Sequence, residues 1–179
     1  MYKKSKTLSE MELQGSCHCE KVKFTVKSHT PVPFMRCYCS ICRKVDGGGG
    51  YSINIMGQAR IIRINNDTLK VNGMEYVKSY RGIKDKSLPK NRQKECGNKR
   101  HFCGECGCML WAYDQQYPEW CYPFASAIDT PLPKPKQIIC IMLKDKADWA
   151  HVPERAVEFD EYPEDSIESW HKNNKAWVD

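Results

Sequence analysis

Closely spaced cysteines constrain this chain more than any other feature of its sequence. The segments GSCHC, at residues 15–19, and CYCSIC, at residues 37–42, each place thiols two or three residues apart. A third segment, CGEC, lies at residues 103–106. Thiols at such spacings are disulfide partners, small buried side chains or metal ligands, and the spacing by itself leaves all three readings open.

The remaining sequence favours metal binding over disulfides. The charged start, MYKKSKTLSEMELQG, lacks the apolar segment of a signal peptide, and no run of about 18 apolar residues could span a bilayer. We therefore expect a cytoplasmic protein, with the nucleus as an alternative compartment, and no membrane partner. Thiols stay reduced in these compartments, so metal binding is the first expectation for the eleven cysteines.

Short segments rich in β-branched and aromatic residues predict a mainly β domain with a short C-terminal helix. With 179 residues, 41% of them hydrophobic, the chain is long enough to bury its own core. We expect a flexible N-terminal segment at 1–13, a zinc-binding domain at 14–150, and a C-terminal extension at 151–179 packed on that domain. The expected strands are VKFTV, YSINIM, ARIIRI, LKV, EYVKSY, MLWAY and QIICIML, and the expected helix lies in YPEDSIESWHKNN, with Pro163 in its first turn.

Three segments are predicted to be irregular. Four consecutive glycines at 47–50 indicate a loop with access to unusual backbone angles. Residues 82–100 are basic and nearly devoid of apolar side chains, which predicts a long surface loop. Prolines at 131, 133 and 135 exclude regular strand pairing there.

Four cysteines from distant parts of the chain are predicted to form a structural zinc site. Residues two apart in an extended segment point to the same face, so Cys17 and Cys19 present their thiols side by side. Cys103 and Cys106 form a tight turn whose glycines leave backbone N–H groups for the sulfurs. Four thiolates complete the tetrahedral shell that zinc prefers, and a closed shell is typical of a structural site.

The second cluster, Cys37, Cys39 and Cys42, supplies three thiols and no fourth within the same stretch. Three protein ligands with one exchangeable position are typical of catalytic zinc. We thus predict two zinc ions per chain. A fourth ligand for the second site could come from three residues, although we favour none of them: Cys96, Cys108 and His101.

The other aromatic and cysteine side chains are assigned to the core. Cys121 and Cys140 lie in apolar segments and are expected to be buried. Of the aromatic residues after the third cysteine segment, we expect most to pack the core and a minority to line a substrate cleft; they are Trp111, Tyr113, Trp120, Tyr122 and Phe124.

The motifs carry a resemblance. The order GSCHC, then C-x-C-S-x-C, then F-C-x-x-C-G-x-x-L, followed by AID at 127–129 and KADW at 146–149, resembles the glutathione-dependent formaldehyde-activating enzyme family, which includes centromere protein V. The resemblance implies a β-tent fold, a structural zinc on the first four cysteines and a catalytic zinc on the other three. It also implies the joining of formaldehyde to glutathione to give S-hydroxymethylglutathione.

We therefore predict a zinc-dependent carbon–sulfur lyase that acts on a small thiol adduct, with glutathione as the candidate thiol. The alternative is a non-catalytic zinc scaffold that binds a protein or chromatin. Seven thiolates and two zinc ions would lower the formal charge from +6 to about +3, which mildly attracts an anionic thiol. A nucleic-acid partner is not expected, because the basic segment at 82–100 has no interleaved aromatic side chains.

Overall fold

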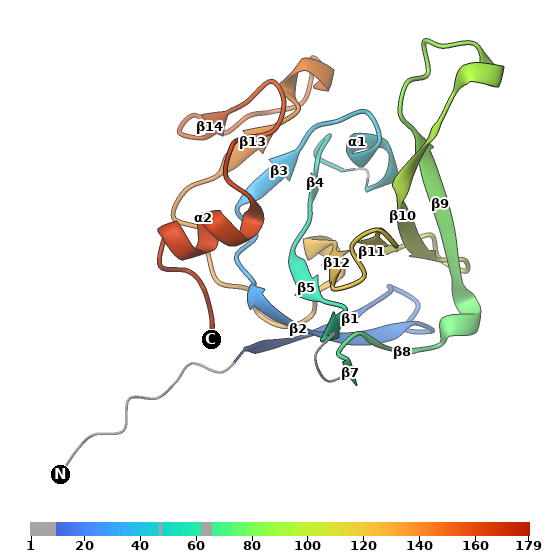
Figure 1. The fold of residues 1–179 in the computed structure, drawn as a ribbon, viewed down its shortest axis with the longest axis vertical. Helices are drawn as coiled ribbons and strands as arrows, with labels where there is room; N and C mark the ends of the chain where they lie inside the picture. The colour runs from blue at the N-terminus through green and yellow to red at the C-terminus, as the bar shows by residue number, and fades with distance from the viewer. Residues whose placement is uncertain (1–9, 47, 62–65) are drawn as a thin grey trace.

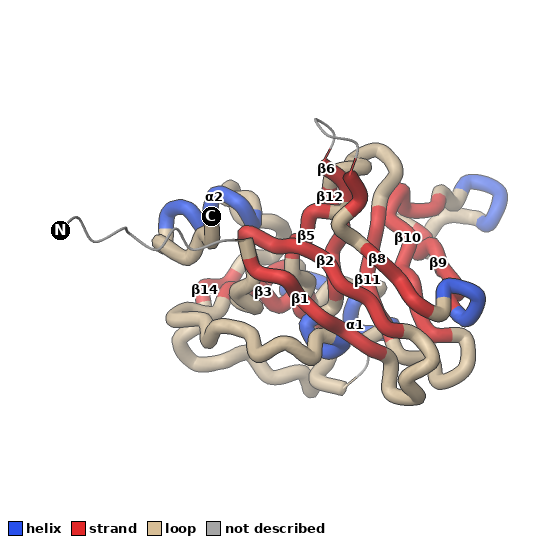
Figure 2. Tube along the Cα trace, turned by 90° about the horizontal axis from the view of Figure 1, so that it is seen from below, coloured by secondary structure: helices blue, strands red, loops and turns tan. Residues whose placement is uncertain are grey.

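The computed structural model describes residues 10–46, 48–61 and 66–179, and its fold is mainly β (Figure 1). This confirms the predicted class. The larger sheet has the order β1 (Met11–Ser16), β2 (Lys23–Thr30), β5 (Met56–Gln58), β12 (Trp120–Pro123), β11 (Met109–Tyr113), β10 (Glu95–Cys103) and β9 (Val77–Ile83). These neighbours pair antiparallel, and β8 (Lys70–Asn72) pairs with the first half of β2, so that β1 and β8 flank it (Figure 2).

A smaller sheet stands beside the larger one. Its order is β14 (Val157–Glu158), β13 (Ile139–Ile141), β3 (Met35–Cys37) and β4 (Ser52–Ile53), with β13 parallel to both of its neighbours. A short ribbon joins β6 (Arg60–Ile61) to β7 (Asn66–Asp67). The helical elements are α1 (Cys42–Val45), α2 (Ile167–Asn173) and the 3-10 turns η2 (Met74–Tyr76), η3 (Lys90–Arg92), η4 (Ala125–Ala127) and η5 (Leu143–Asp145).

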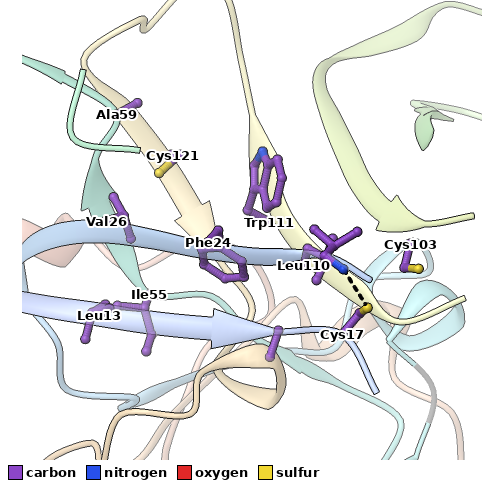
Figure 3. Packing of buried hydrophobic residues seen from close by; sticks show 12 residues of the cluster. Leu13, Cys17, Phe24, Val26, Ile55, Ala59, Cys103, Leu110, Trp111 and Cys121 are labelled. Carbon is purple, nitrogen blue, oxygen red and sulfur yellow. Dashed lines mark hydrogen bonds between the residues drawn. The ribbon is translucent and has the colours of Figure 1, made fainter. Parts of the chain in front are cut away.

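The main core lies on one face of the larger sheet. Alternate residues of β2, among them Phe24 and Val26, are buried, as expected for strands with one apolar face. The Phe24 ring meets Trp111 of β11 edge to face, with ring centroids 5.3 Å apart. Figure 3 shows two cysteines, Cys17 and Cys103, at the edge of this cluster. One of the cysteine groups is therefore anchored directly in the core.

The C-terminal segment packs on the smaller sheet through α2. The Ser166 side chain accepts the Ser169 N–H at 3.0 Å, which caps the first turn of the helix. The Trp170 indole stacks on Phe34 with ring centroids 3.7 Å apart, and both rings are buried. The predicted helix is thus confirmed, but the placement of Pro163 in its first turn is wrong. The helix begins at Ile167, four residues after Pro163, because Ser166 supplies the cap.

Two boundaries differ from the sequence-based expectation. Residues 11–13, expected to be flexible, belong to β1, because Leu13 stands between the polar, exposed residues Glu12 and Gln14 and is fully buried. Residues 95–100, expected to be loop, form the first part of β10, because Glu95, Lys99 and Arg100 pair with β9 and the last two also with β11; the register shifts between Glu95 and Lys99. Only 84–94 connect the two strands, and this hairpin extends from the body of the molecule (Figure 1).

Other expected segments are confirmed in part. MLWAY coincides with β11, whereas YSINIM divides between β4 and β5. Residues 62–64 of ARIIRI, residues 1–9 of the lead-in and Gly47 lie outside the described residues. Gly48 and Gly50 form a turn with φ values of 55° and 80°, conformations that favour glycine.

Candidate metal centres and the cavity beside them

Four cysteines from two distant segments converge at the edge of the core. The thiols of Cys17, Cys19, Cys103 and Cys106, here called the four-thiol group, all lie within 4.8 Å of one another. The Cys17 and Cys19 sulfurs are 3.5 Å apart, and those of Cys19 and Cys103 are 3.7 Å apart. Thiolates arranged tetrahedrally about 2.3 Å from zinc would be separated by about 3.8 Å. The group therefore has the chemistry and size of a four-coordinate metal site.

Tight backbone turns aim these sulfurs at one point. The Val22 N–H donates to the Cys17 sulfur at 3.3 Å, a bond drawn as a dashed line in Figure 3. Gly107 adopts a φ of 73°, and its N–H donates to the Cys103 carbonyl at 2.9 Å. Desolvation opposes ionisation of Cys106, but nearby backbone N–H groups outweigh it and lower the pKa of this thiol to about 6. The turn at Cys106 thus favours the thiolate that a metal requires. At Cys19 a backbone hydrogen bond lowers the pKa, but desolvation and hydrogen bonds with the neighbouring thiols outweigh it and raise the pKa to about 12.

The second group, here called the three-thiol group, comprises Cys37 at the end of β3, Cys39 in the following turn and Cys42 at the start of α1. Their thiols also lie within 4.8 Å of one another, and Cys37 and Cys42 are buried. Hydrogen bonds from the other two thiols and from the Cys42 N–H, which lies 3.4 Å from the sulfur, lower the pKa of Cys39. Hydrogen bonds with Cys39 and Cys42 raise the pKa of Cys37. The group holds one negative charge readily, and a cation would favour ionisation of the others.

No fourth His, Cys, Asp or Glu joins the three-thiol group in the part of the chain that the structure describes. Cys108 instead approaches the Met109 carbonyl, with 3.6 Å from sulfur to oxygen, and His101 stacks on Trp111 at a centroid distance of 5.2 Å. Cys96 belongs to neither thiol group. All eleven cysteines lie within the described residues and are free thiols.

The remaining side-chain expectations are largely met. Cys121 and Cys140 are fully buried, as predicted. Trp111 and Phe124 are buried in the core, while Tyr113 and Trp120 are half-buried. Tyr122 is the one of the five aromatic residues that lines the cavity described next. The expected division between a core majority and a cleft minority therefore holds.

A cavity of about 310 Å³ opens on the three-thiol group. One wall is a row across three paired strands, where Arg100 of β10 faces Ala112 of β11, which in turn faces Tyr122 of β12. The other wall includes the three thiols and Ile141 of β13. The complete lining is Cys37, Cys39, Cys42, Asn54, Asn98, Arg100, Ala112, Asp114, Tyr117, Tyr122, Ile141 and Tyr162.

Sequence reasoning missed several of these lining residues. Asn98 and Arg100 stand in a stretch predicted to be a solvent-exposed loop, and Tyr162 comes from the C-terminal segment. Their sequence context carries no signal for a cavity, because charged and polar side chains in a basic stretch usually face water. A larger hollow of about 670 Å³ lies over β1, β2 and β8, but it contains no thiol.

Comparison with known proteins points to one family. The family model described as glutathione-dependent formaldehyde-activating enzyme matches residues 12–140. A Halomonas elongata protein, provisionally named as such an enzyme, is 45% identical over 164 residues, which are 90% of this chain and 95% of that protein. A crystal structure of a Rhodobacter sphaeroides protein aligns with a TM-score of 0.46 and 22% identity, over 69% of this chain and 92% of that one. Within the described ranges, no helix is long and apolar enough to cross a membrane.

Proposed function

Because the chain belongs to the glutathione-dependent formaldehyde-activating enzyme family, we propose that it is a zinc-dependent carbon–sulfur lyase. In the synthetic direction it would join glutathione to formaldehyde and give S-hydroxymethylglutathione. The observation that carries this proposal is the three-thiol group in the wall of a cavity, with no fourth protein ligand among the described residues. A thiol substrate could complete such a shell.

The two cysteine groups take different parts in this proposal. The four-thiol group would hold a structural zinc through Cys17, Cys19, Cys103 and Cys106, and the three-thiol group would hold the catalytic one. Zinc bound there supplies a Lewis acid that keeps a thiol ligand as its thiolate. The lowered pKa of Cys39 supplies one thiolate for a cation, whereas Cys37 and Cys42, whose pKa values are raised, would release their protons as the cation binds.

The reaction is an addition in which atoms and electrons balance. The glutathione sulfur lone pair forms the new C–S bond with the aldehyde carbon, and the C=O π pair moves to the oxygen. The oxygen takes up one proton, and the thiol has released one, so no oxidant or reductant is needed. The cavity keeps the two reactants together, which is the contribution that positioning makes.

Tyrosine hydroxyls in the cavity are the candidate donors to the developing oxyanion. Tyr117, Tyr122 and Tyr162 all line it. Burial, and then the neighbouring Cys121, raise the pKa of Tyr122, so its O–H remains protonated at neutral pH. A fixed O–H donor in a partly dry site stabilises a forming alkoxide. We place the reaction in the cytoplasm; the comparisons give no support for the nucleus.

The rival hypothesis of a non-catalytic scaffold depends on a closed second site. Cys96, Cys108 and His101 were the candidates for its fourth ligand, and none of them joins the three-thiol group. The arrangement therefore favours the enzyme.

Metal analysis combined with turnover tests the proposed function. We expect about two zinc ions per chain, and exchange NMR should show faster formation and breakdown of the glutathione–formaldehyde adduct than in buffer alone. Cys39→Ser should fold, lose about one zinc and lose this acceleration, whereas Cys17→Ser should be poorly soluble. Cys96→Ser is the matched control and should resemble the wild type. Full zinc content and full rate in Cys39→Ser would refute the assignment.

A further inference from the structure

A buried guanidinium in the cavity has no carboxylate partner among the residues that the structure describes. The Arg100 side chain is 8% exposed, its Nε has no hydrogen-bond partner, and its Nη1 reaches only the Asn98 carbonyl at 3.5 Å. None of the ion pairs found among the described residues includes Arg100. Asp114 lines the same cavity, but its Oδ1 accepts the Gln116 N–H at 3.0 Å instead. Burying an unpaired charge is costly, so an anion is expected to complete this site.

A second unpartnered group lies beside the first. Asn98 and Arg100 are two residues apart on β10 and both line the cavity, so they share one face of the strand. The Asn98 Oδ1 is also buried without a hydrogen-bond partner. This oxygen accepts and would take a hydrogen-bond donor of the ligand, such as an amide N–H, while the Asn98 N–H groups and the guanidinium suit the two oxygens of a carboxylate.

The surrounding residues leave room for such an anion next to the thiols. Ala112, the residue paired with Arg100 on β11, ends at its Cβ and keeps the space before the guanidinium open. The three-thiol group forms the facing wall, so a single ligand could meet both. Positive charge also concentrates on this strand pair: residues 81–100 carry eight Lys or Arg and two Asp or Glu, a formal +6 that equals the value for the whole chain. An anionic ligand would be drawn towards this part of the molecule.

We propose that Arg100, assisted by Asn98, binds a carboxylate of the thiol substrate and so restricts this enzyme to acidic thiols. The inference rests on the proposed function, in which the substrate sulfur lies at the three-thiol group. Arg100 is thereby a specificity residue: the guanidinium anchors one end of the substrate while its sulfur meets the reacting carbon. Tyr162, which is 71% exposed, stands at the opening of the cavity and belongs to the C-terminal segment outside the residues matched by the family model.

Calorimetric titration of the zinc-loaded protein tests this proposal with two probes, glutathione and its diethyl ester, which has the same thiol and no carboxylate. The wild type should bind glutathione at least about tenfold more tightly than the diester, because the hydrogen bonds to a charged group are lost in the ester. Arg100→Gln should weaken glutathione binding about ten- to a hundredfold and leave the diester unchanged. Lys84→Gln removes the same unit charge from an exposed position of the hairpin and should change neither affinity by more than about twofold.

The alternative role for Arg100 is to balance the charge of the cysteine thiolates. In that case Arg100→Gln would lose zinc or melt at a lower temperature, and it would weaken both probes equally. On our proposal the ligand-free variant keeps its zinc and melts at or above the wild-type temperature, because an unpaired buried charge has been removed. Equal affinity of the wild type for the two probes would overturn the proposal without any variant.

The experiment separates this proposal from the proposed function. If the wild type accelerates adduct formation and binds both probes equally, the carboxylate site is wrong and the lyase stands. If the wild type neither binds a thiol nor accelerates the reaction, the lyase fails and the carboxylate site fails with it.

Discussion

Replacing Trp170 by Ala tests whether the C-terminal segment is an integral part of the fold. The indole is 5% exposed and stacks on Phe34, with an angle of 4° between the rings. Truncating a buried tryptophan to alanine costs about 3–5 kcal/mol in the free energy of unfolding. For a domain of this size, each kcal/mol lowers the melting temperature by about 2–4 °C. Trp170→Ala should therefore melt about 6–20 °C below the wild type.

Thermal melts of zinc-loaded protein, followed by circular dichroism, measure this effect. Trp149→Ala is the matched control, because its indole is 70% exposed and its loss should cost no more than about 0.5 kcal/mol. A Trp170→Ala melting temperature within about 2 °C of the wild type would refute the packing of α2 against the smaller sheet. The same result would contradict the expectation that residues 151–179 pack on the domain.

The outcome also bears on the cavity. Tyr162 precedes α2 by only a few residues, and its place in the cavity lining depends on where this segment runs. If α2 detaches in Trp170→Ala below the main transition, the cavity loses this wall first. Glutathione affinity should then fall while the metal content of the four-thiol group stays constant.

Three further perturbations have defined outcomes. Burial lowers the pKa of His171, whose Nε2 accepts the Val32 N–H at 3.1 Å, so the unfolded state binds more protons. Stability to urea should therefore fall as the pH drops through 6.5, the ordinary histidine value, and His171→Gln should reduce that slope; an unchanged slope would contradict the assignment. Gly73→Ala should destabilise by more than about 2 kcal/mol, because its Cβ would lie 1.9 Å from the Lys21 carbonyl oxygen at a φ of 80°. Gly48→Ala, with a φ of 55° and open space around the Cβ, should lose only about 1 kcal/mol in the same denaturation assay, and equal losses would remove the steric argument. A chelator should strip metal from the three-thiol group before circular dichroism changes, and loss of both metals in one unfolding step would contradict separate roles.

The closely spaced cysteines within each group could be predicted from sequence because their geometry is local, whereas the meeting of Cys17 and Cys19 with Cys103 and Cys106 depends on tertiary contacts. A C-x-C segment places two thiols together wherever the strand runs, and C-x-x-C closes a turn without tertiary help. The strands with alternating apolar residues were predictable for the same reason. MLWAY coincides with β11 because it is a short, continuous apolar run, typical of a strand buried on both faces, and residues 110–112 are all buried.

The cavity could not be predicted, because its lining is produced by pairing between distant strands. In the sequence, Arg100 resembles the other basic residues of a predicted solvent-exposed loop. Its burial follows only from the strand register that places it opposite Ala112. The first half of β10 is polar, so its strand conformation depends on β9 and β11 rather than on propensity. Asn98 and Tyr162 could not be predicted as lining residues either, because tertiary contacts between distant segments bring them to the cavity.

Chain separation explains why two cysteine groups of similar chemistry should differ in their effect on the fold. Cys19 and Cys103 are 84 residues apart, so a metal that joins them closes a loop comparable to that of a long-range disulfide. On the chain-entropy model such a closure stabilises by about 4.6 kcal/mol, against about 2 kcal/mol for a loop of roughly six residues, the span of the three-thiol group. The three-thiol group also lies on β3 and α1, which are held by β13, β4 and the Ser52 hydroxyl, 2.9 Å from the Cys42 carbonyl. Its geometry is therefore supported by the protein, which agrees with our proposal that a metal there would exchange ligands while a metal in the four-thiol group would stabilise the fold.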